Sequence, residues 1–149
     1  MNETTISEAE WEIMLVVWAN SPVTSQTIIN VLTPKMDWKP STIKTLINRL
    51  LNKGYIKAEK EGRAFLYEAT VSEKEMLMTS FKALLGQTCA RRSGELLQEL
   101  ITDTVLSQKD LARLEQVIQD KQLTAPLEVP CDCLPGQCQC HLFYGKGEK

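Results

Sequence analysis

The sequence has a single histidine, few aromatic residues and no long apolar run. Its 149 residues include 6% aromatics. The longest apolar run, Ile13 to Ala19, is far shorter than the roughly twenty residues of a membrane-spanning helix. A glycine-rich phosphate loop and a nucleophile motif are also missing, so we expect neither a membrane protein nor an enzyme.

Basic residues are absent from the start of the chain, where none precedes Lys35. A secretory signal opens with positive charge and continues with an apolar stretch, so none is expected here. The hydrophobic share of 43% and the charged share of 24% are typical of soluble globular proteins. We therefore expect a cytoplasmic protein whose cysteines stay reduced.

The basic residues that do occur are concentrated in one block. Residues 35–63 hold eight bases against three acids, although the whole chain has a net charge of −2. Such a block favours a local anion-binding surface, and a solvated helix and turn remain the alternative.

The N-terminal part has the pattern of three helices and a hairpin. Ser7 and Glu10 have capping-box spacing, and the first helix ends near Pro22. A second helix begins at Thr24 or Ser25 and stops at Pro34. A third runs from Pro40 to Gly54. Two strands, 55–60 and 63–69, flank a Glu61-Gly62 turn, which predicts a winged helix-turn-helix over residues 1–70.

Three short amphipathic helices follow, the first capped by Ser72 and Glu75 and the last beginning at Ser107. Because they lack a large core of their own, we predict a helical dimerisation region over 71–122, with packing back onto the first domain as the alternative. Residues 123–149 form a linker and tail. The predicted fold class is mainly α, with a winged helix-turn-helix, a helical dimerisation region and a cysteine-rich metal-binding tail.

The exposed face of the third helix carries side chains suited to a nucleic-acid reader. Predicted base contacts are Thr42, Thr45, Asn48 and Arg49. Predicted phosphate contacts are Lys39, Ser41, Lys44 and Lys53, with Lys60 and Arg63 beside the wing turn.

Four of the five cysteines lie in ten residues: Cys131, Cys133, Cys138 and Cys140. In an extended chain the members of each Cys-x-Cys pair share a face, and Pro135-Gly136 suits a type II turn that folds the two pairs together. Four thiolates suit tetrahedral zinc and also copper(I). Disulfides and a purely structural zinc clip are the alternatives. We expect His141 to be a bystander and Cys89 to be a small core residue on a helix.

Three segments, Ser7–Trp18, Ser41–Gly54 and Glu61–Tyr67, resemble the penicillinase repressor (BlaI/MecI) family over about residues 5–120. The tail pattern Cys-x-Cys-x4-Cys-x-Cys resembles its copper-responsive, CopY-type branch. This resemblance implies a homodimer that binds a palindromic DNA operator of copper-homeostasis genes while zinc-bound. It also implies release when Cu(I), with a copper chaperone as its donor, displaces zinc from the four tail cysteines.

Two other functions fit the same sequence. One is a winged-helix repressor whose zinc is only structural and whose inducer is different. The other is a copper storage or delivery protein that uses its N-terminal domain for protein contacts.

Overall fold

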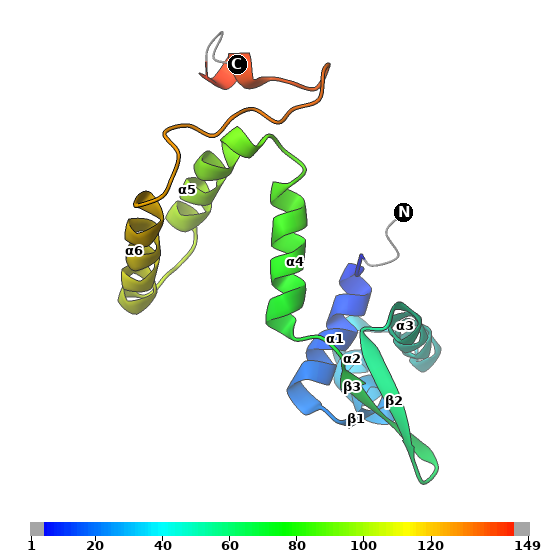
Figure 1. Ribbon diagram of the computed structural model, residues 1–149. Helices are drawn as coiled ribbons and strands as arrows, with labels where there is room; N and C mark the ends of the chain where they lie inside the picture. The colour runs from blue at the N-terminus through cyan, green and yellow to red at the C-terminus, as the bar shows by residue number, and fades with distance from the viewer. Residues whose placement is uncertain (1–4, 145–149) are drawn as a thin grey trace. The chain divides into compact units, whose positions relative to one another are not determined.

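The computed structural model describes residues 5–144 and divides into two compact units, Met1–Thr79 and Ser80–Lys149 (Figure 1). The first unit holds six elements and the start of a seventh. In chain order they are α1 (Glu8–Asn20), β1 (Val23–Thr24), α2 (Ser25–Met36), α3 (Pro40–Lys53), β2 (Ile56–Glu61), β3 (Ala64–Ala69) and the start of α4 (Glu73–Leu85).

The first two helices begin at the expected caps. The Ser7 hydroxyl accepts a hydrogen bond from the Glu10 amide, and the Thr24 hydroxyl accepts one from the Thr27 amide. The prediction that α2 stops at Pro34 is wrong. Proline removes only one helical hydrogen bond there, and α2 continues to Met36, which packs against the core.

Helix α3 has the predicted bounds. Lys39 precedes it, Pro40 occupies its first turn, and Gly54 ends it with a left-handed φ of 79°. Glycine adopts this conformation without the steric cost that other residues meet. The helix buries one stripe, namely Ile43, Leu46, Ile47 and Leu50. Its opposite face is therefore left to solvent.

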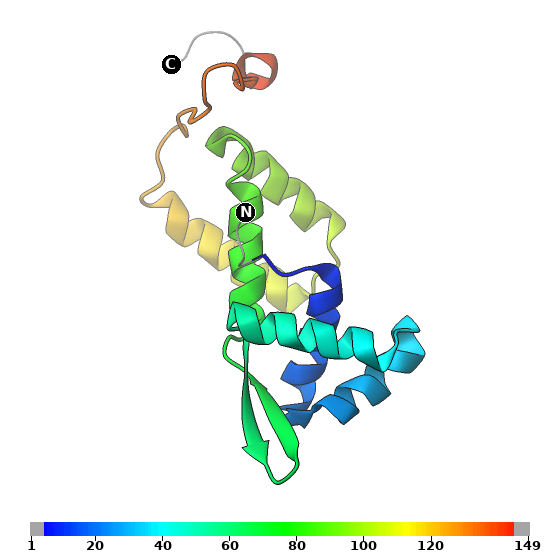
Figure 2. The same cartoon turned by 90° about the vertical axis from the view of Figure 1, so that its right-hand side faces the viewer.

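Strands β2 and β3 form the predicted wing, whose tip projects away from the three helices (Figures 1 and 2). The turn lies one residue later than predicted, at Gly62-Arg63, because Glu61 pairs with Ala64 in the ladder. Gly62 has a φ of 62°, which suits the first central position of a type II′ turn. The two-residue strand β1 was not predicted. It pairs with β3 and makes the sheet order β1-β3-β2.

The core of the first unit is built mainly from the three helices. Fully buried members include Ile13, Val17, Ile28, Ile43 and Leu50. Met76 of α4 joins this core. For this reason the first unit extends to Thr79, beyond the boundary at residue 70 that the sequence suggests.

The second unit contains the rest of α4, a short 3-10 helix η1 (Ala90–Arg92), α5 (Ser93–Asp103), α6 (Gln108–Gln122) and α7 (Cys140–Tyr144). The predicted capping box of α4 is present, with reciprocal hydrogen bonds between Ser72 and Glu75. Of residues 80–142, only Cys89 and Cys140 are buried. The helices of this unit therefore expose their apolar faces.

Within residues 5–144, no helix combines the length and the apolar character that crossing a membrane requires.

Candidate nucleic-acid interface and metal centre

The polar face of α3 is exposed along its whole length. All of its predicted contact residues except Lys53 are exposed, as are the two beside the wing turn. The exposed set is Lys39, Ser41, Thr42, Lys44, Thr45, Asn48, Arg49, Lys60 and Arg63. No acidic residue occurs in α3, so this face carries an unbalanced positive charge.

Ion pairs inside the first unit divide the eight bases of residues 35–63 into two groups. Lys35 pairs with Glu12 at 2.6 Å, Lys53 with Glu10 at 2.8 Å and Lys57 with Glu68 at 3.2 Å. Among the described residues, the other five bases have no such partner. These five are Lys39, Lys44, Arg49, Lys60 and Arg63.

Lys53 has a structural position that the sequence did not indicate. Its ammonium group donates to both carboxylate oxygens of Glu10, at 2.8 and 3.0 Å, and to the Thr5 carbonyl at 2.9 Å. Glu10 is only 2% exposed, and its carboxylate lies against Lys53 rather than at the start of its own helix as a capping box requires. Because this charge is neutralised within the domain, we leave Lys53 out of the proposed phosphate contacts.

The side chain of Thr45 has only part of its bonding capacity free. Its hydroxyl donates to the Ser41 carbonyl one turn earlier, at 3.0 Å. The proton is therefore committed, and the methyl group and the oxygen lone pairs remain for contacts outside the helix.

The wing is close to neutral as a whole. Its bases Lys57, Lys60 and Arg63 are matched by Glu59, Glu61 and Glu68. Arg63 nevertheless lies in the turn at the wing tip, and Lys60 lies near it at the end of β2. The tip is the part of the wing that reaches furthest from α1, α2 and α3 (Figure 2). The unbalanced positive charge of the exposed face therefore comes from α3 and not from the wing.

The cysteine tail folds back on itself as the sequence predicted. The Gln137 amide donates to the Leu134 carbonyl at 3.0 Å, and Gly136 at the third turn position has a φ of 88°. These are the features of a type II turn. Across it, the sulfurs of Cys131 and Cys138 lie 3.6 Å apart, and those of Cys133 and Cys140 lie 3.7 Å apart.

A fifth thiol joins this group, contrary to prediction. The Cys140 sulfur lies 3.4 Å from that of Cys89 and 3.4 Å from that of Cys131. Cys89 is not on a helix but in the turn after α4, directly before η1. It is 9% exposed, yet what it contacts is sulfur rather than an apolar core. In the sequence, Gly86 directly after α4 indicates that the helix ends before Cys89.

One group of four sulfurs is tighter than the rest. The Sγ atoms of Cys89, Cys131, Cys133 and Cys140 all lie within 4.8 Å of one another. Cys138, one of the four predicted ligands, is not a member, although it touches Cys131. Among the described residues, His141 is exposed and does not belong to this group of four.

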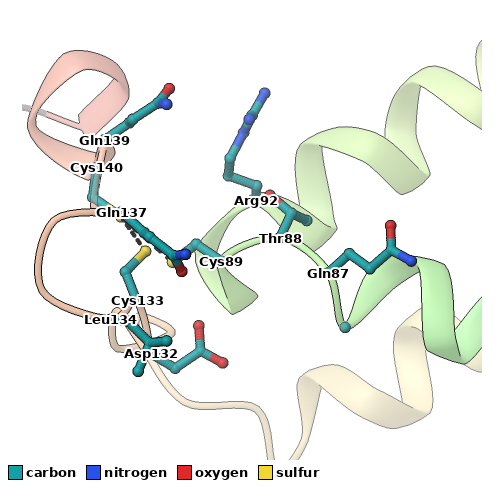
Figure 3. A pocket seen from close by; sticks show the side chains of 11 residues that line it. Gln87, Thr88, Cys89, Arg92, Asp132, Cys133, Leu134, Gln137, Gln139 and Cys140 are labelled. Atoms are coloured by element: carbon teal, nitrogen blue, oxygen red, sulfur yellow. Dashed lines mark hydrogen bonds between the residues drawn. The ribbon is translucent and has the colours of Figure 1, made fainter. Parts of the chain in front are cut away.

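A hydrogen bond holds the tail against the turn that carries Cys89. Asp132, which lies between the first two tail cysteines, accepts a hydrogen bond from the Ala90 amide at 2.9 Å. The tail and the turn also line a pocket of about 470 Å³, into which Cys89, Cys133 and Cys140 converge (Figure 3). The sulfur group is thus anchored to the end of α4.

The sulfur spacing fits a metal ion bound by thiolates. Sulfurs placed tetrahedrally about 2.3 Å from a zinc ion lie about 3.8 Å from one another. The four closest contacts here measure 3.4 to 3.7 Å. A small contraction or expansion of the group would accommodate zinc or copper(I), so the residues present fit such an ion.

The thiols affect one another's ionisation. The Arg91 amide lowers the pKa of Cys89 to about 7, and the Cys140 amide lowers the pKa of Cys138. Hydrogen bonding to Cys131 raises the pKa of Cys140 to about 12, and contact with Cys89 raises that of Cys133. Thiols this close do not all ionise unless a cation compensates the charge.

Taken together, the three-helix unit, the sheet order and the projecting hairpin define a winged-helix DNA-binding protein that carries a thiol cluster. The profile of the penicillinase repressor family matches residues 6–120. The chain belongs to this family, and it is a DNA-binding transcriptional repressor and not an enzyme. The cysteine segment lies beyond the matched residues.

Individual relatives cover different parts of the chain. An uncharacterised 16.5 kDa protein in the ptsI 3′ region of Latilactobacillus sakei is 47% identical over 93% of this chain and 95% of its own length. The methicillin resistance regulatory protein MecI of Mammaliicoccus sciuri is 30% identical over 78% and 94%. The solution structure of the DNA-binding domain of the repressor BlaI is 36% identical, with a TM-score of 0.46, over 50% of this chain and 90% of that one.

Proposed function

We propose that this repressor responds to copper: it holds a palindromic operator of copper-homeostasis genes in its zinc-bound form and releases it when Cu(I) replaces zinc. The observation that carries the proposal is the convergence of the tail thiols across the Pro135-Gly136 turn. Soft thiolate ligands select copper(I) and zinc over harder cations. A cytoplasmic copper chaperone is the expected Cu(I) donor.

The proposed DNA surface is the exposed face of α3 with the wing tip. Arg49 and Asn48 are suited to bidentate contacts with guanine and adenine, and the Thr42 and Thr45 methyl groups to thymine. Lys39, Ser41 and Lys44 are the proposed phosphate contacts, with Lys60 and Arg63 on the neighbouring backbone. Support comes from their exposure and from the lack of ion pairs between the five bases and any acid in residues 5–144.

The proposed partner of the second unit is a second copy of the chain. Large apolar side chains on three helices stay exposed, among them Phe81 of α4, Leu100 of α5 and Val117 of α6. A unit whose only buried residues between 80 and 142 are two cysteines needs such a partner. A twofold dimer also matches a palindromic operator, since each protomer then reads one half-site.

Charge alone does not explain release. Four thiolates with one Zn²⁺ and four thiolates with two Cu⁺ have the same formal charge. We therefore attribute release to a change in how the tail is held against the helices. A coupling of about 1–3 kcal/mol, typical of allosteric proteins, is sufficient.

The test is a gel shift on the DNA upstream of the chain's own gene, with zinc, with Cu(I) or with neither. We expect Cu(I) to weaken operator binding at least about tenfold relative to zinc. The matched variant replaces Cys131, Cys133, Cys138 and Cys140 with serine, and its binding should no longer respond to copper.

The alternatives give different results. A repressor with a structural zinc and another inducer would bind the operator equally in zinc and in Cu(I). A storage or delivery protein would bind copper but no specific DNA. Either outcome contradicts the proposal.

A further inference from the structure

We propose that Cys89 is a metal ligand, which ties the tail to the turn between α4 and α5 in the zinc-bound form. This inference rests on the proposed zinc-binding function of the tail. The four mutually close sulfurs are those of Cys89, Cys131, Cys133 and Cys140. The Cys89–Cys140 separation of 3.4 Å is as short as any sulfur contact within the tail itself.

A hydrogen bond and the burial of two cysteines hold Cys89 against the tail. Asp132 accepts the Ala90 amide hydrogen bond, so the residue between two tail cysteines is joined to the residue after Cys89. Cys89 and Cys140 are also the only buried residues between 80 and 142. Burial in this unit is therefore concentrated where the tail meets the turn (Figure 3).

Two of the possible sets of four thiols matter for this proposal. One set includes Cys89 and links the tail to the helices. The other is the tail alone, with Cys138 in place of Cys89. Cys138 is exposed and touches Cys131 at 3.6 Å, so it is accessible to an arriving Cu(I) ion.

An exchange between the two sets would release the tail from the turn. Zn²⁺ held by the first set would leave as two Cu⁺ ions bind the second set, so Cys89 would lose its metal–sulfur bond and Cys138 would gain one. The proton that the Cys138 thiol would lose is balanced by one that Cys89 would take up, and no electron would be transferred. Cys89 would then lose its link to the tail, and the turn that joins α4 to α5 would lose a constraint.

The experiment measures metal binding in the full-length protein without DNA. Cobalt(II) is the spectroscopic probe, and zinc affinity is measured by competition with a chelator. We expect Cys89→Ser to weaken zinc by at least the roughly 10–100-fold that loss of an outer-shell partner costs, and to lower the sulfur-to-cobalt charge-transfer absorption. The comparison variant Cys138→Ser removes a proposed Cu(I) ligand that lies outside the zinc set. It should weaken zinc binding and lower the absorption much less than Cys89→Ser does.

Two results would overturn the inference. One is the reverse order, with Cys138→Ser weakening zinc and Cys89→Ser leaving it unchanged. The other is an unchanged cobalt spectrum in Cys89→Ser. Helical content of each metal-free variant, measured by circular dichroism, separates loss of a ligand from loss of folding. Because operator DNA is absent, failure here is distinct from failure of the copper response.

Discussion

At the scale of single residues, two lysines of α3 have different roles: one stabilises the fold, and the other is available for binding DNA. Lys44 is exposed and has no ion-pair partner among the described residues, whereas Lys53 compensates the buried carboxylate of Glu10. A buried charge that loses its partner is strongly destabilising, while an exposed lysine contributes little to folding. The two residues therefore predict opposite phenotypes.

Lys53→Met should lower the free energy of unfolding by about 3 kcal/mol and leave the salt dependence of operator binding unchanged. Lys44→Met should change stability by less than about 0.5 kcal/mol. It should reduce the slope of log affinity against log salt by about 0.9 for each protomer, or about 1.8 for the dimer. Urea denaturation and salt titration of operator binding measure the two quantities. A reduced salt slope in Lys53→Met would show that Lys53 does contact a DNA phosphate, contrary to this prediction.

At the scale of elements, end caps matter most where packing contributes least. Helix α6 buries no residue, and its start is held by reciprocal hydrogen bonds between Ser107 and Asp110. The Ser107 hydroxyl and amide lower the pKa of Asp110 from its ordinary value of 3.8. The ionised carboxylate is therefore the form that stabilises the helix.

Asp110→Ala should reduce helical content at neutral pH. Because the pKa is lower in the folded state, this contribution is fully present above 3.8 and is lost as the pH falls through the lowered value. The difference between variant and parent in circular dichroism should therefore disappear in strong acid. Glu115→Ala, in the same helix, is the control and should show little effect. An Asp110→Ala deficit that persists in acid would contradict the role of the charge.

At the scale of the whole molecule, the two units differ in how they bury apolar surface. The first has a continuous core drawn from its three helices and the sheet. The second leaves Phe81, Leu97, Leu100 and Ile118 at least 45% exposed. Such helices become stable when another apolar surface covers them, which is the physical basis of the proposed dimer.

Leu100→Ala should weaken the dimer at least about thirtyfold, equivalent to about 2 kcal/mol, if Leu100 lies at the centre of the interface. Thr102→Ala, which lies about 200° around α5 from Leu100 and is exposed, should have little effect. Sedimentation equilibrium gives the dissociation constants. A chain that sediments as a monomer at all concentrations, or an unchanged constant for Leu100→Ala, would contradict the proposed dimer.

Features that depend on neighbours along the chain were predictable from the sequence. Capping at Ser7, Ser72 and Ser107, the end of α3 at Gly54 and the tail turn at Pro135-Gly136 all follow from local hydrogen bonding and allowed backbone angles. The buried stripe of α3 follows from helical spacing in the same way.

Features that join distant residues were decided only by the tertiary structure. Strand β1 has two residues and no pattern of its own, and it exists because β3 provides its partner. The side chain of Lys53 resembles that of any other lysine until α1 brings Glu10 beside it. Cys89 is isolated in the sequence, and it joins the thiol cluster because the chain returns to it more than forty residues later. Sequence patterns over a few neighbouring residues do not predict such contacts, because the free energy that stabilises them is gained only when distant segments pack together.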